Sequence, residues 1–368
     1  MGYLKYGIAE NDTRKIHSWI KSYEYDPNLS LENIKVELSQ IEEFTLSDQM
    51  IEKLGQTFRE DLILLFMHFT QLKKIKILWI EEESGIMEHI PFRHLSCIEH
   101  ITFESCKFKA LPEEIYELKT LRELFIYYAL EVDGISDKIN QLQELTCLSI
   151  TSDKLTCLPD SIGELKNLQK LSISTPKIES VPESIGKLSK LVKLHLDTGK
   201  VFPKSISQLA NLEELYLQYW DDGKSFSEEE FSEHLKVTVL LLKNLKHFYI
   251  KSIYLRKMPS WFDQMNYLEG IRFARLEDEQ TLPSIFRKFK NLKSLAFTEN
   301  RITEIPEWIV ELGNIEYLDF SSTHLVNVSL VVTKLPKLKL LRLVMLFYME
   351  EKTLEKIRFM LPKCEVIG

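Results

Sequence analysis

Five residues of the two types that most often bind zinc, histidine and cysteine, lie close together in the stretch HIPFRHLSCIEHITFESC, from residue 89 to residue 106. They are His89, His94, Cys97, His100 and Cys106. A zinc ion requires four ligands that converge at about 2.0–2.3 Å. The apolar residues of this stretch instead fit a short strand followed by a loop, which sends the candidate ligands in different directions. We therefore predict ordinary strand and loop residues here, and no metal site.

Other catalytic motifs are missing from the sequence. The chain has 12 glycines but no glycine-rich phosphate loop, and it contains neither GxSxG nor HExxH. Carboxylates such as Glu113, Glu114 and Glu164 stand at positions that we expect to be solvated. We predict that the protein is not an enzyme and that it has no cofactor.

Composition restricts the partner and the compartment. Hydrophobic residues make up 44% of the 368 residues and charged residues 28%, which is typical of a soluble folded protein. The net charge of −8 argues against nucleic acid or an anionic membrane as the partner. The 5 cysteines are irregularly spaced, which favours a reducing compartment. With no apparent signal peptide and no apolar run long enough to cross a bilayer, we expect a cytoplasmic monomer without membrane insertion.

One phrase recurs along the chain. LPDSIGEL begins at Leu158 and VPESIGKL at Val181, 23 residues later, and related phrases begin at Leu111, Phe202, Met258, Leu282 and Ile305. Between them stand units of the form apolar-x-x-apolar-x-apolar, each predicting a short strand with one buried face. These units begin at Ile75, Ile98, Leu121, Leu145, Leu168, Leu191, Leu212, Leu245, Leu268, Leu292, Ile315 and Leu338.

This repeat resembles the LPxxIxxLxxLxxLxL class of the leucine-rich repeat family, which includes bacterial proteins and plant intracellular Ras-group-related proteins. The resemblance covers residues 72–368. It implies an α/β fold, a right-handed solenoid or horseshoe with a concave parallel β-sheet, a helical or irregular convex side and a cap at each end. The family's shared property is a surface that binds other molecules, so the resemblance says little about function.

The chain departs from the family pattern in the loops. The family usually places an inward Asn or Cys two residues past each strand, and here Asn300 and Cys106 fit that pattern, as does Thr323. Elsewhere the position holds Ala129, Asp153, Pro176, Gly199, Trp220, Ile253, Leu276 and Leu346. We therefore expect irregular loops.

We predict three regions. Residues 1–71 form an N-terminal cap of mixed helix and strand, with a strand within IKVELSQIEEF, although a separate adaptor domain is the alternative. Residues 72–348 form an array of about 12 repeats with a helical insertion near residues 221–244. Residues 349–368 form a C-terminal cap, a helix followed by a short strand.

The insertion carries a helix signature. Ser227 precedes Glu230 by three residues, which is a capping box, and Phe226 and Phe231 occupy the positions of a hydrophobic staple. We expect a helix from Ser227 toward Leu242 that packs on the convex side, with a binding protrusion as the alternative.

The repeat register predicts which side chains face solvent on the concave side. The residue between the last two apolar positions forms one row: Trp79, Thr102, Phe125, Ser149, Ser172, His195, Tyr216, Tyr249, Arg272, Ala296, Asp319 and Arg342. A second row, two residues further on, begins with Glu81, Glu104 and Tyr127.

The best candidate site lies on four adjacent strands of this surface. His195, Tyr216, Tyr249 and Arg272 lie side by side in the predicted register, and exposed tyrosine and arginine are enriched at protein interfaces. The alternative to an interface is that the tyrosines simply pack on one another across the strands. We also expect Arg272 to stack on Tyr249. Further candidate contacts are Asp197, Gln218, Tyr219, Lys251 and Arg275, together with Phe125 and Tyr127.

The sequence favours a non-catalytic scaffold or adaptor that binds a protein partner on its concave face. A dedicated inhibitor that occludes an enzyme or toxin is the alternative. Recognition of a glycan or another small ligand is the lesser alternative.

Overall fold

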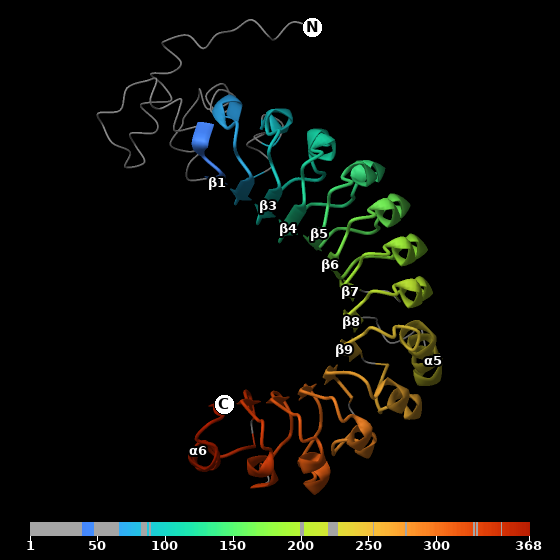
Figure 1. Ribbon diagram of the computed structural model, residues 1–368, viewed down its shortest axis with the longest axis vertical. Coiled ribbons are helices and arrows are strands. Elements are labelled where there is room, and N and C mark those ends of the chain that lie inside the picture. The colour runs from blue at the N-terminus through green and yellow to red at the C-terminus, as the bar shows by residue number, and fades with distance from the viewer. Residues whose placement is uncertain are drawn as a thin grey trace, which may run out of the picture. The chain divides into compact units, whose positions relative to one another are not determined.

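The computed structural model describes residues 39–47, 66–81, 87, 90–198, 202–219, 227–252, 254–276, 278–326, 328, 330–346 and 348–368. The chain divides into two compact units, Met1–Ser184 and Ile185–Gly368. Each unit stacks short strands side by side and returns the chain through short helices on the opposite side (Figure 1).

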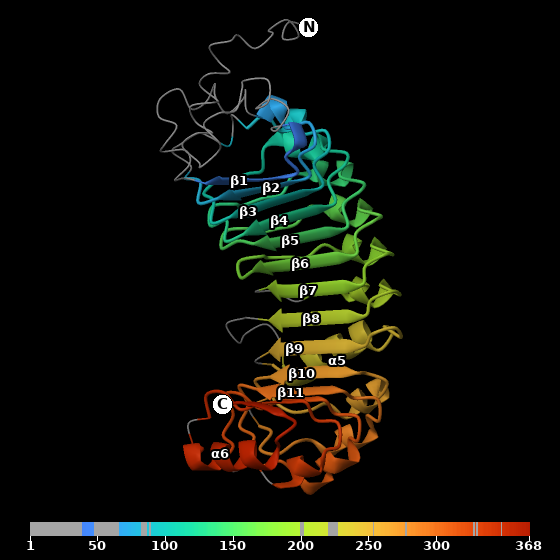
Figure 2. The ribbon, with the colours of Figure 1, turned by 60° about the vertical axis from the view of Figure 1, so that its left-hand side comes forward.

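The first unit contains one parallel sheet in which each strand pairs with the next one along the chain (Figure 2). Its strands are β1 (Glu43–Ser47), β2 (Lys74–Leu78), β3 (His100–Glu104), β4 (Glu123–Tyr127), β5 (Cys147–Thr151) and β6 (Lys170–Thr175). Its 3-10 helices are η3 (Phe92–His94), η4 (Glu113–Glu117), η5 (Asp137–Gln141) and η6 (Asp160–Glu164), and η7 (Glu183–Lys187) contains the junction of the two units.

The second unit repeats the arrangement, again with parallel pairing between successive strands. Its strands are β7 (Lys193–Thr198), β8 (Glu214–Tyr219), β9 (His247–Ser252), β10 (Gly270–Ala274), β11 (Ser294–Thr298), β12 (Tyr317–Asp319), β13 (Leu340–Arg342) and β14 (Glu365–Ile367). Its helices are η8 (Lys204–Gln208), α5 (Glu228–Val239), η9 (Ser260–Met265), η10 (Ser284–Lys288), η11 (Glu307–Glu311), η12 (Leu330–Lys334) and α6 (Glu351–Met360). The predicted α/β solenoid of stacked repeats is confirmed.

The recurring proline phrase starts the 3-10 helices. In six of them the N-cap residue is the proline of this phrase, with φ between −53° and −71°, and its missing N–H costs nothing at a helix start. The apolar residue three positions later is buried each time, as at Ile162 and Ile309. The phrase therefore turns the chain and anchors the helix in the core at once.

Glycine follows this isoleucine in two repeats because the next repeat leaves no room for a side chain. A Cβ atom on Gly163 would lie 2.3 Å from the carbonyl oxygen of Ser184, and one on Gly186 would lie 2.7 Å from that of Ser205. Contacts this short with backbone cannot be relieved by a rotamer change.

We predict that Gly163→Ala lowers the free energy of unfolding by roughly 1–3 kcal/mol through overpacking. Gly313→Ala is the control, because nothing lies within 4 Å of its Cβ position, and it should change the value by under about 1 kcal/mol. Urea denaturation followed by circular dichroism gives both values. Equal losses in the two variants would contradict the packing argument.

The first predicted repeat was wrong by three residues. Ile75 pairs with Ile101 and Ile77 with Phe103, so the strand phrase is LKKIKI, beginning at Leu72, rather than IKILWI. Both phrases fit the apolar pattern, and only the pairing with β3 distinguishes them. Lys76 therefore takes the place predicted for Trp79, and Leu78 the place predicted for Glu81.

Strand β1 adds a repeat within the predicted N-terminal cap. Glu43 pairs with Lys74 and Leu46 with Ile77 in the same parallel register as the later strands. The expected strand at IKVELSQIEEF overlaps β1 only at Glu43 and Phe44. Most of the segments expected to form the cap helices, and the start of the chain, lie outside the described residues.

The loops after the strands are of two kinds, which confirms the expected irregularity. After seven strands one residue adopts a left-handed conformation, with φ between 54° and 69°, and the residue after it turns inward, as Cys106 and Asn300 do. The residues with positive φ are Trp79, Ser105, Tyr128, Arg275, Glu299, Ser322 and Met345. After β5 to β9 the corresponding position is not left-handed in the described residues, and the inward residue comes one position earlier.

This difference corrects the predicted inward positions of the middle repeats. Ser152 and Thr175 are buried there, while Asp153 and Pro176 are exposed. The serine hydroxyl of Ser152 donates to the carbonyl of Val132 at 2.7 Å, so a short polar side chain replaces the usual asparagine. Gly199, Trp220 and Ile253 lie outside the described residues.

An asparagine ladder does exist, but it lies before the strands instead of after them. The side-chain amides of Asn167, Asn211, Asn244 and Asn314 each donate to a backbone carbonyl of the preceding repeat at 2.8 Å. The recurring "KN", "AN" and "GN" dipeptides were the sequence signal for it.

Helix α5 confirms the helix predicted after Ser227. The Ser227 side chain accepts a hydrogen bond from the backbone N–H of Glu230, and the Glu230 carboxylate accepts one from the backbone N–H of Ser227. Phe231, Leu235 and Val239 are fully buried, so the helix packs on the second unit. Phe226, the other half of the expected staple, lies outside the described residues.

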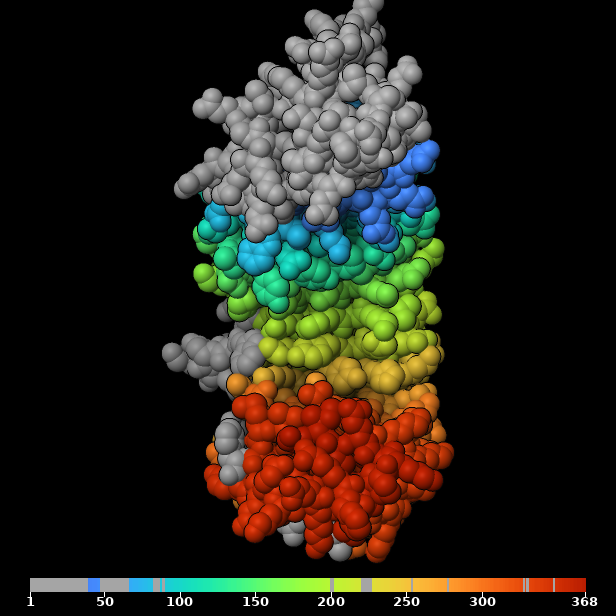
Figure 3. Space-filling model, turned by 90° about the vertical axis from the view of Figure 1, so that its left-hand side faces the viewer, coloured from blue at the N-terminus to red at the C-terminus, as the bar shows by residue number. Residues whose placement is uncertain are grey.

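The chain ends as expected, with helix α6 followed by strand β14, which pairs with β13. Figure 3 shows the last repeats and α6, in red, as one continuous packed surface.

Candidate functional site

The four side chains of the best predicted site form a continuous row on the second unit. His195 pairs with Tyr216, Tyr216 with Tyr249, and Tyr249 with Arg272 in the strand register. Each stands at the third position of its strand, and its neighbours in the strand, such as Leu215 and Leu217, point into the core. We call these four residues the central row, and the solvent-facing side of the sheet the strand face.

Within the central row the aromatic rings pack on one another. The ring centroids of His195 and Tyr216 are 4.0 Å apart, and those of Tyr216 and Tyr249 are 6.1 Å apart. The Tyr216 hydroxyl donates to the side-chain oxygen of Gln218 at 2.7 Å. The three rings are therefore half-buried against one another. Their positions are fixed before any partner binds.

These rings are neutral near pH 7. Burial raises the pKa of the Tyr216 and Tyr249 hydroxyls. Burial lowers the pKa of His195, although the nearby charge of Asp197 partly opposes this effect. The Nε2 atom of His195 is buried without a hydrogen-bond partner, which agrees with an uncharged imidazole.

Arg272 forms an ion pair that the sequence did not predict. Its neighbour on β11 is the small residue Ala296, and the guanidinium passes over it to reach Asp319 on β12, with Nη2 and Oδ2 2.8 Å apart. This direction is opposite to Tyr249, so the expected stacking of Arg272 on Tyr249 was wrong. Because Ala296 has only a methyl side chain, the Arg272 side chain can extend across β11 to Asp319.

Asp319 is the centre of a polar network on the strand face. The residue is only 1% exposed, and its carboxylate accepts hydrogen bonds from the Tyr317 hydroxyl at 2.8 Å and from the backbone N–H of Ser321 at 2.9 Å. A buried carboxylate is costly unless it is paired and hydrogen-bonded, and here it is both.

The network shifts two pKa values. Burial alone would raise the pKa of Asp319, but the hydrogen bonds from Ser321 and Tyr317 and the charge of Arg272 outweigh it and lower that pKa. Burial, and then the hydrogen bond to Asp319, raises the pKa of Tyr317 to about 12. Asp319 is therefore ionised and Tyr317 protonated near neutral pH.

A second charge cluster borders the central row. Glu299 forms ion pairs with Lys251 and with Arg275, the latter at 3.1 Å. Lys251 reaches Glu299 across the small residue Ala274 of β10, much as Arg272 crosses Ala296. Burial would raise the pKa of Glu299, but its two cationic partners lower it overall.

A small hollow of about 90 Å³ separates the tyrosines from these charges. Its lining includes Tyr216, Tyr249, Lys251, Arg272 and Glu299, together with the small residue Ala274. The hollow is large enough for part of a side chain only, and it offers aromatic and cationic groups together.

Tyr219 does not belong to this surface, which corrects the prediction. Its side chain is 2% exposed and stacks on Phe231 of α5, with ring centroids 5.7 Å apart. Because β8 has no left-handed residue at its end, Tyr219 continues the strand alternation and points inward. Asp197 and Gln218 pair in the register and do lie on the strand face.

Phe125 and Tyr127 lie on the strand face of the first unit, on the same strand, β4. Their rings stack with centroids 5.6 Å apart and an interplanar angle of 22°. Burial raises the pKa of Tyr127, while a hydrogen bond with the Ser149 side chain opposes the shift.

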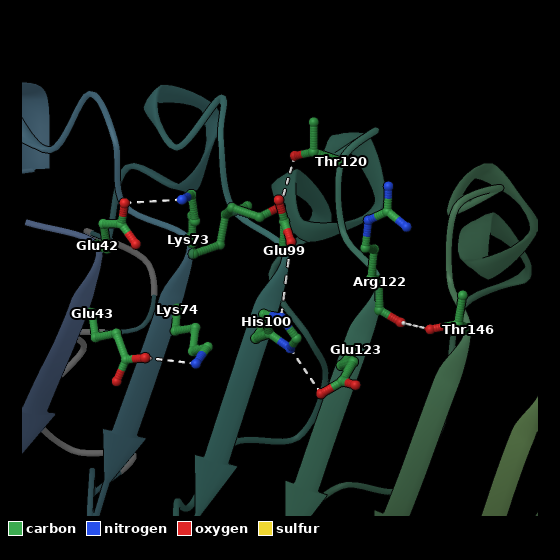
Figure 4. Close-up of polar contacts among 11 residues, drawn as sticks. Glu42, Glu43, Lys73, Lys74, Glu99, His100, Thr120, Arg122, Glu123 and Thr146 are labelled. Atoms are coloured by element: carbon green, nitrogen blue, oxygen red, sulfur yellow. Dashed lines mark hydrogen bonds and ion pairs between the residues drawn. The ribbon is translucent and has the colours of Figure 1, made fainter.

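The residues considered for zinc have other roles where they are described. His100 accepts or donates a hydrogen bond with Glu123 at 2.7 Å within a ladder of charged pairs that includes Lys74 and Glu43 (Figure 4). The Cys106 thiol is buried and donates to the carbonyl of Ile77. Among the described residues no three His, Cys, Asp or Glu side chains converge as metal ligands, and His89 lies outside them.

We therefore expect the purified protein to contain less than about one zinc ion per ten chains, because the residues that the structure describes offer no converging set of ligands. Elemental analysis by mass spectrometry after dialysis measures this content. One zinc ion per chain that resists mild chelation would contradict the prediction and return attention to residues 89–106.

Comparison with known proteins gives consistent results. Residues 137–236 match the family model of a leucine-rich repeat region. The volume-regulated anion channel subunit LRRC8B of Mus musculus is 31% identical over 147 residues, which cover 39% of this chain but only 18% of that protein.

Two solved structures support the fold. A leucine-rich repeat protein of Leptospira interrogans has a TM-score of 0.52 and 23% identity, covering 94% of this chain and 100% of that chain. A structure of the TLR13–ssRNA13 complex has a TM-score of 0.51 and 16% identity, covering 86% of this chain and 56% of that chain. Similarity at this level of identity concerns the fold alone. In the described part of the chain, no helix has the length and apolar character needed to span a bilayer.

Proposed function

Because this chain is a leucine-rich repeat protein, we propose that it is a non-catalytic interaction module that binds a partner protein on the strand face of the second unit. The central row forms the middle of that binding surface. The observation that carries the proposal is the run of His195, Tyr216, Tyr249 and Arg272 across four adjacent strands, held in place by its own contacts. We also propose that the protein acts as a monomer in the cytoplasm.

Two properties of this surface favour protein binding. Tyrosine and arginine are enriched among the side chains that contribute most at interfaces. Tyrosine buries a large area with few rotatable bonds, and the planar guanidinium of arginine donates several hydrogen bonds in a fixed geometry. Arg272 is already fixed by Asp319, and Tyr216 by Gln218, so less conformational entropy is lost when a partner binds. The hollow beside Tyr249 provides a place for one anchoring side chain.

A dedicated inhibitor of an enzyme or toxin is the second candidate function, and it would use the same surface. An inhibitor should form a nanomolar complex with one enzyme, whereas a scaffold should bind several partners or bind more weakly. A glycan ligand is less favoured, because cations and carboxylates border the tyrosines on the strand face.

The central row should account for most of the binding energy. We expect Tyr249→Ala to weaken binding by about 2 kcal/mol or more, a roughly thirtyfold loss, because truncating a central interface anchor typically has this effect. The partner is first captured from the native cell by affinity purification and identified by mass spectrometry. Isothermal titration calorimetry with the purified partner then gives the affinities.

The matched control is Phe359→Ala, which removes an exposed aromatic ring from α6, away from the strand face. It should leave the affinity unchanged. Both variants must melt at the temperature of the parent protein, so that lost binding is not lost folding. If Tyr249→Ala binds as tightly as the parent, the binding surface lies elsewhere, and the α5 insertion is then the next region to test.

A further inference from the structure

A second surface, on the first unit, combines aromatic rings with one carboxylate. Leu78, Glu104 and Tyr127 are neighbours in the register of β2, β3 and β4, so Glu104 stands between the other two on the strand face. All three side chains are partly exposed. Neighbouring strands are about 4.8 Å apart, which brings all three side chains within reach of a single ligand group.

The next residue of each strand extends this surface. Trp79, Ser105 and Tyr128 all adopt left-handed conformations, with φ of 63°, 55° and 54°. The backbone N–H of Trp79 donates to the carbonyl of Glu104 at 2.9 Å, and that of Ser105 to the carbonyl of Tyr127 at 2.8 Å, so the three loops lie in register.

Two large aromatic side chains consequently flank a small one. Trp79 is 59% exposed and Tyr128 is 62% exposed, whereas the residue between them is a serine. A cation placed over Ser105 would be about 5 Å from the backbone of either neighbouring loop, so both exposed aromatic side chains are long enough to reach it.

The carboxylate beside this gap has no cationic partner. Glu104 forms no ion pair with any residue that the structure describes, although charged residues surround it. The nearby cations are engaged elsewhere: Lys107 pairs with Glu81 at 2.7 Å, Lys74 with Glu43 at 2.6 Å, and His100 bonds to Glu123. Lys76 is exposed on β2, beside Thr102 and not beside Glu104.

We propose that Leu78, Trp79, Glu104, Tyr127 and Tyr128 form a binding site for an arginine side chain of a protein partner. The guanidinium group is planar, so it stacks on aromatic faces, and its paired N–H groups match the two oxygens of a carboxylate. Glu104 supplies the carboxylate, and Trp79 and Tyr128 supply the rings. A lysine ammonium would use the charge but not the planar stacking. This site is separate from the central row and does not depend on it.

The experiment uses the full chain labelled with 5-fluorotryptophan and observed by fluorine NMR. The Trp79 resonance is assigned as the one that is missing from Trp79→Phe. The probe is the peptide acetyl-Gly-Arg-Gly-Arg-Gly-amide, compared with the same peptide carrying lysine or glutamate in place of arginine. We expect the arginine peptide to shift the Trp79 resonance at millimolar concentration, the lysine peptide to bind more weakly, and the glutamate peptide to have no effect.

Glu104→Gln should weaken the arginine peptide about tenfold, because it removes a charge-assisted, bidentate contact. Glu117→Gln is the matched control, since it makes the same change in net charge on an exposed residue of η4. The proposal is wrong if the Trp79 resonance does not respond, if the glutamate peptide shifts it equally, or if both variants weaken binding by the same factor. None of these results bears on the central row, because no residue of the second unit is changed and no natural partner is needed.

Discussion

Leu171→Ala should lower the free energy of unfolding by about 2–5 kcal/mol, the usual range for a leucine removed from a close-packed core. Leu171 is 1% exposed and pairs in the register with Leu148 of the preceding strand. Each repeat of a solenoid is stabilised by its neighbours, so a cavity at one inward position weakens two interfaces at once. Guanidinium denaturation followed by circular dichroism measures the loss.

Gln169→Ala is the control for this prediction. Gln169 is exposed immediately before β6, and its backbone N–H bond to Thr146 is kept by alanine. This substitution should lower the free energy of unfolding by less than about 0.5 kcal/mol, as is usual for surface substitutions. Similar losses at the two positions would show that the inward register of β6 is wrong.

Arg272→Met should lower the free energy of unfolding by about 2–3 kcal/mol at pH 7. Removing one partner of a fully buried ion pair typically costs 3–5 kcal/mol, and the value is smaller here because the Arg272 side chain is 39% exposed. The penalty arises because Asp319, almost fully buried, keeps its negative charge without its ion-pair partner. Tyr317 and Ser321 still donate hydrogen bonds to it, which limits the loss.

The pH dependence of this loss distinguishes a charge effect from a packing effect. The folded-state pKa of Asp319 is lowered, so its contribution to stability is present above the unfolded pKa of about 3.9 and is lost as pH falls through the folded pKa. In Arg272→Met the cation is gone, so the pKa of Asp319 is less depressed. The difference in stability between parent and variant should therefore shrink as pH falls below about 4.

Two further variants complete the test. In the double variant Arg272→Met/Asp319→Asn no buried charge is left unpaired, and it should be more stable at pH 7 than Arg272→Met alone. Arg342→Met removes an exposed arginine from the same row of the strand face and should lower the free energy of unfolding by less than about 0.5 kcal/mol. A loss in Arg272→Met that stays constant from pH 7 to pH 3 would argue for packing instead.

This network also affects how binding is tested. A charge reversal at Arg272 would place a second carboxylate beside Asp319 and damage the fold as well as the surface. Tyr249→Ala changes the strand face without removing a partner of a buried charge, and it is therefore the better probe of the central row.

The sequence by itself predicted the repeat, the solenoid, the parallel strands and the helix after Ser227. Each of these rests on local information: apolar spacing, proline at a helix start, and a capping box within four residues. The central row was predicted for the same reason, since a register established for β7 to β10 by four similar phrases carries the alternating residues with it.

The first repeat shows where this local information ends. Two overlapping phrases near Ile75 fit the apolar pattern equally well, and only pairing with β3 selects between them. The position of Trp79 therefore depends on pairing with a neighbouring strand whose partner residues lie 26 positions further along the chain.

Tertiary structure alone decided the remaining features of the site. A left-handed residue at the end of a strand reverses which side chain points inward. Arg275 is left-handed and partly exposed, whereas Tyr219, at the corresponding position of β8, is buried. The ion pair of Arg272 with Asp319 spans two strands and depends on the small side chain of Ala296 between them. Such contacts join residues that are distant in sequence, so no periodic pattern encodes them; they follow from the order in which the strands are stacked.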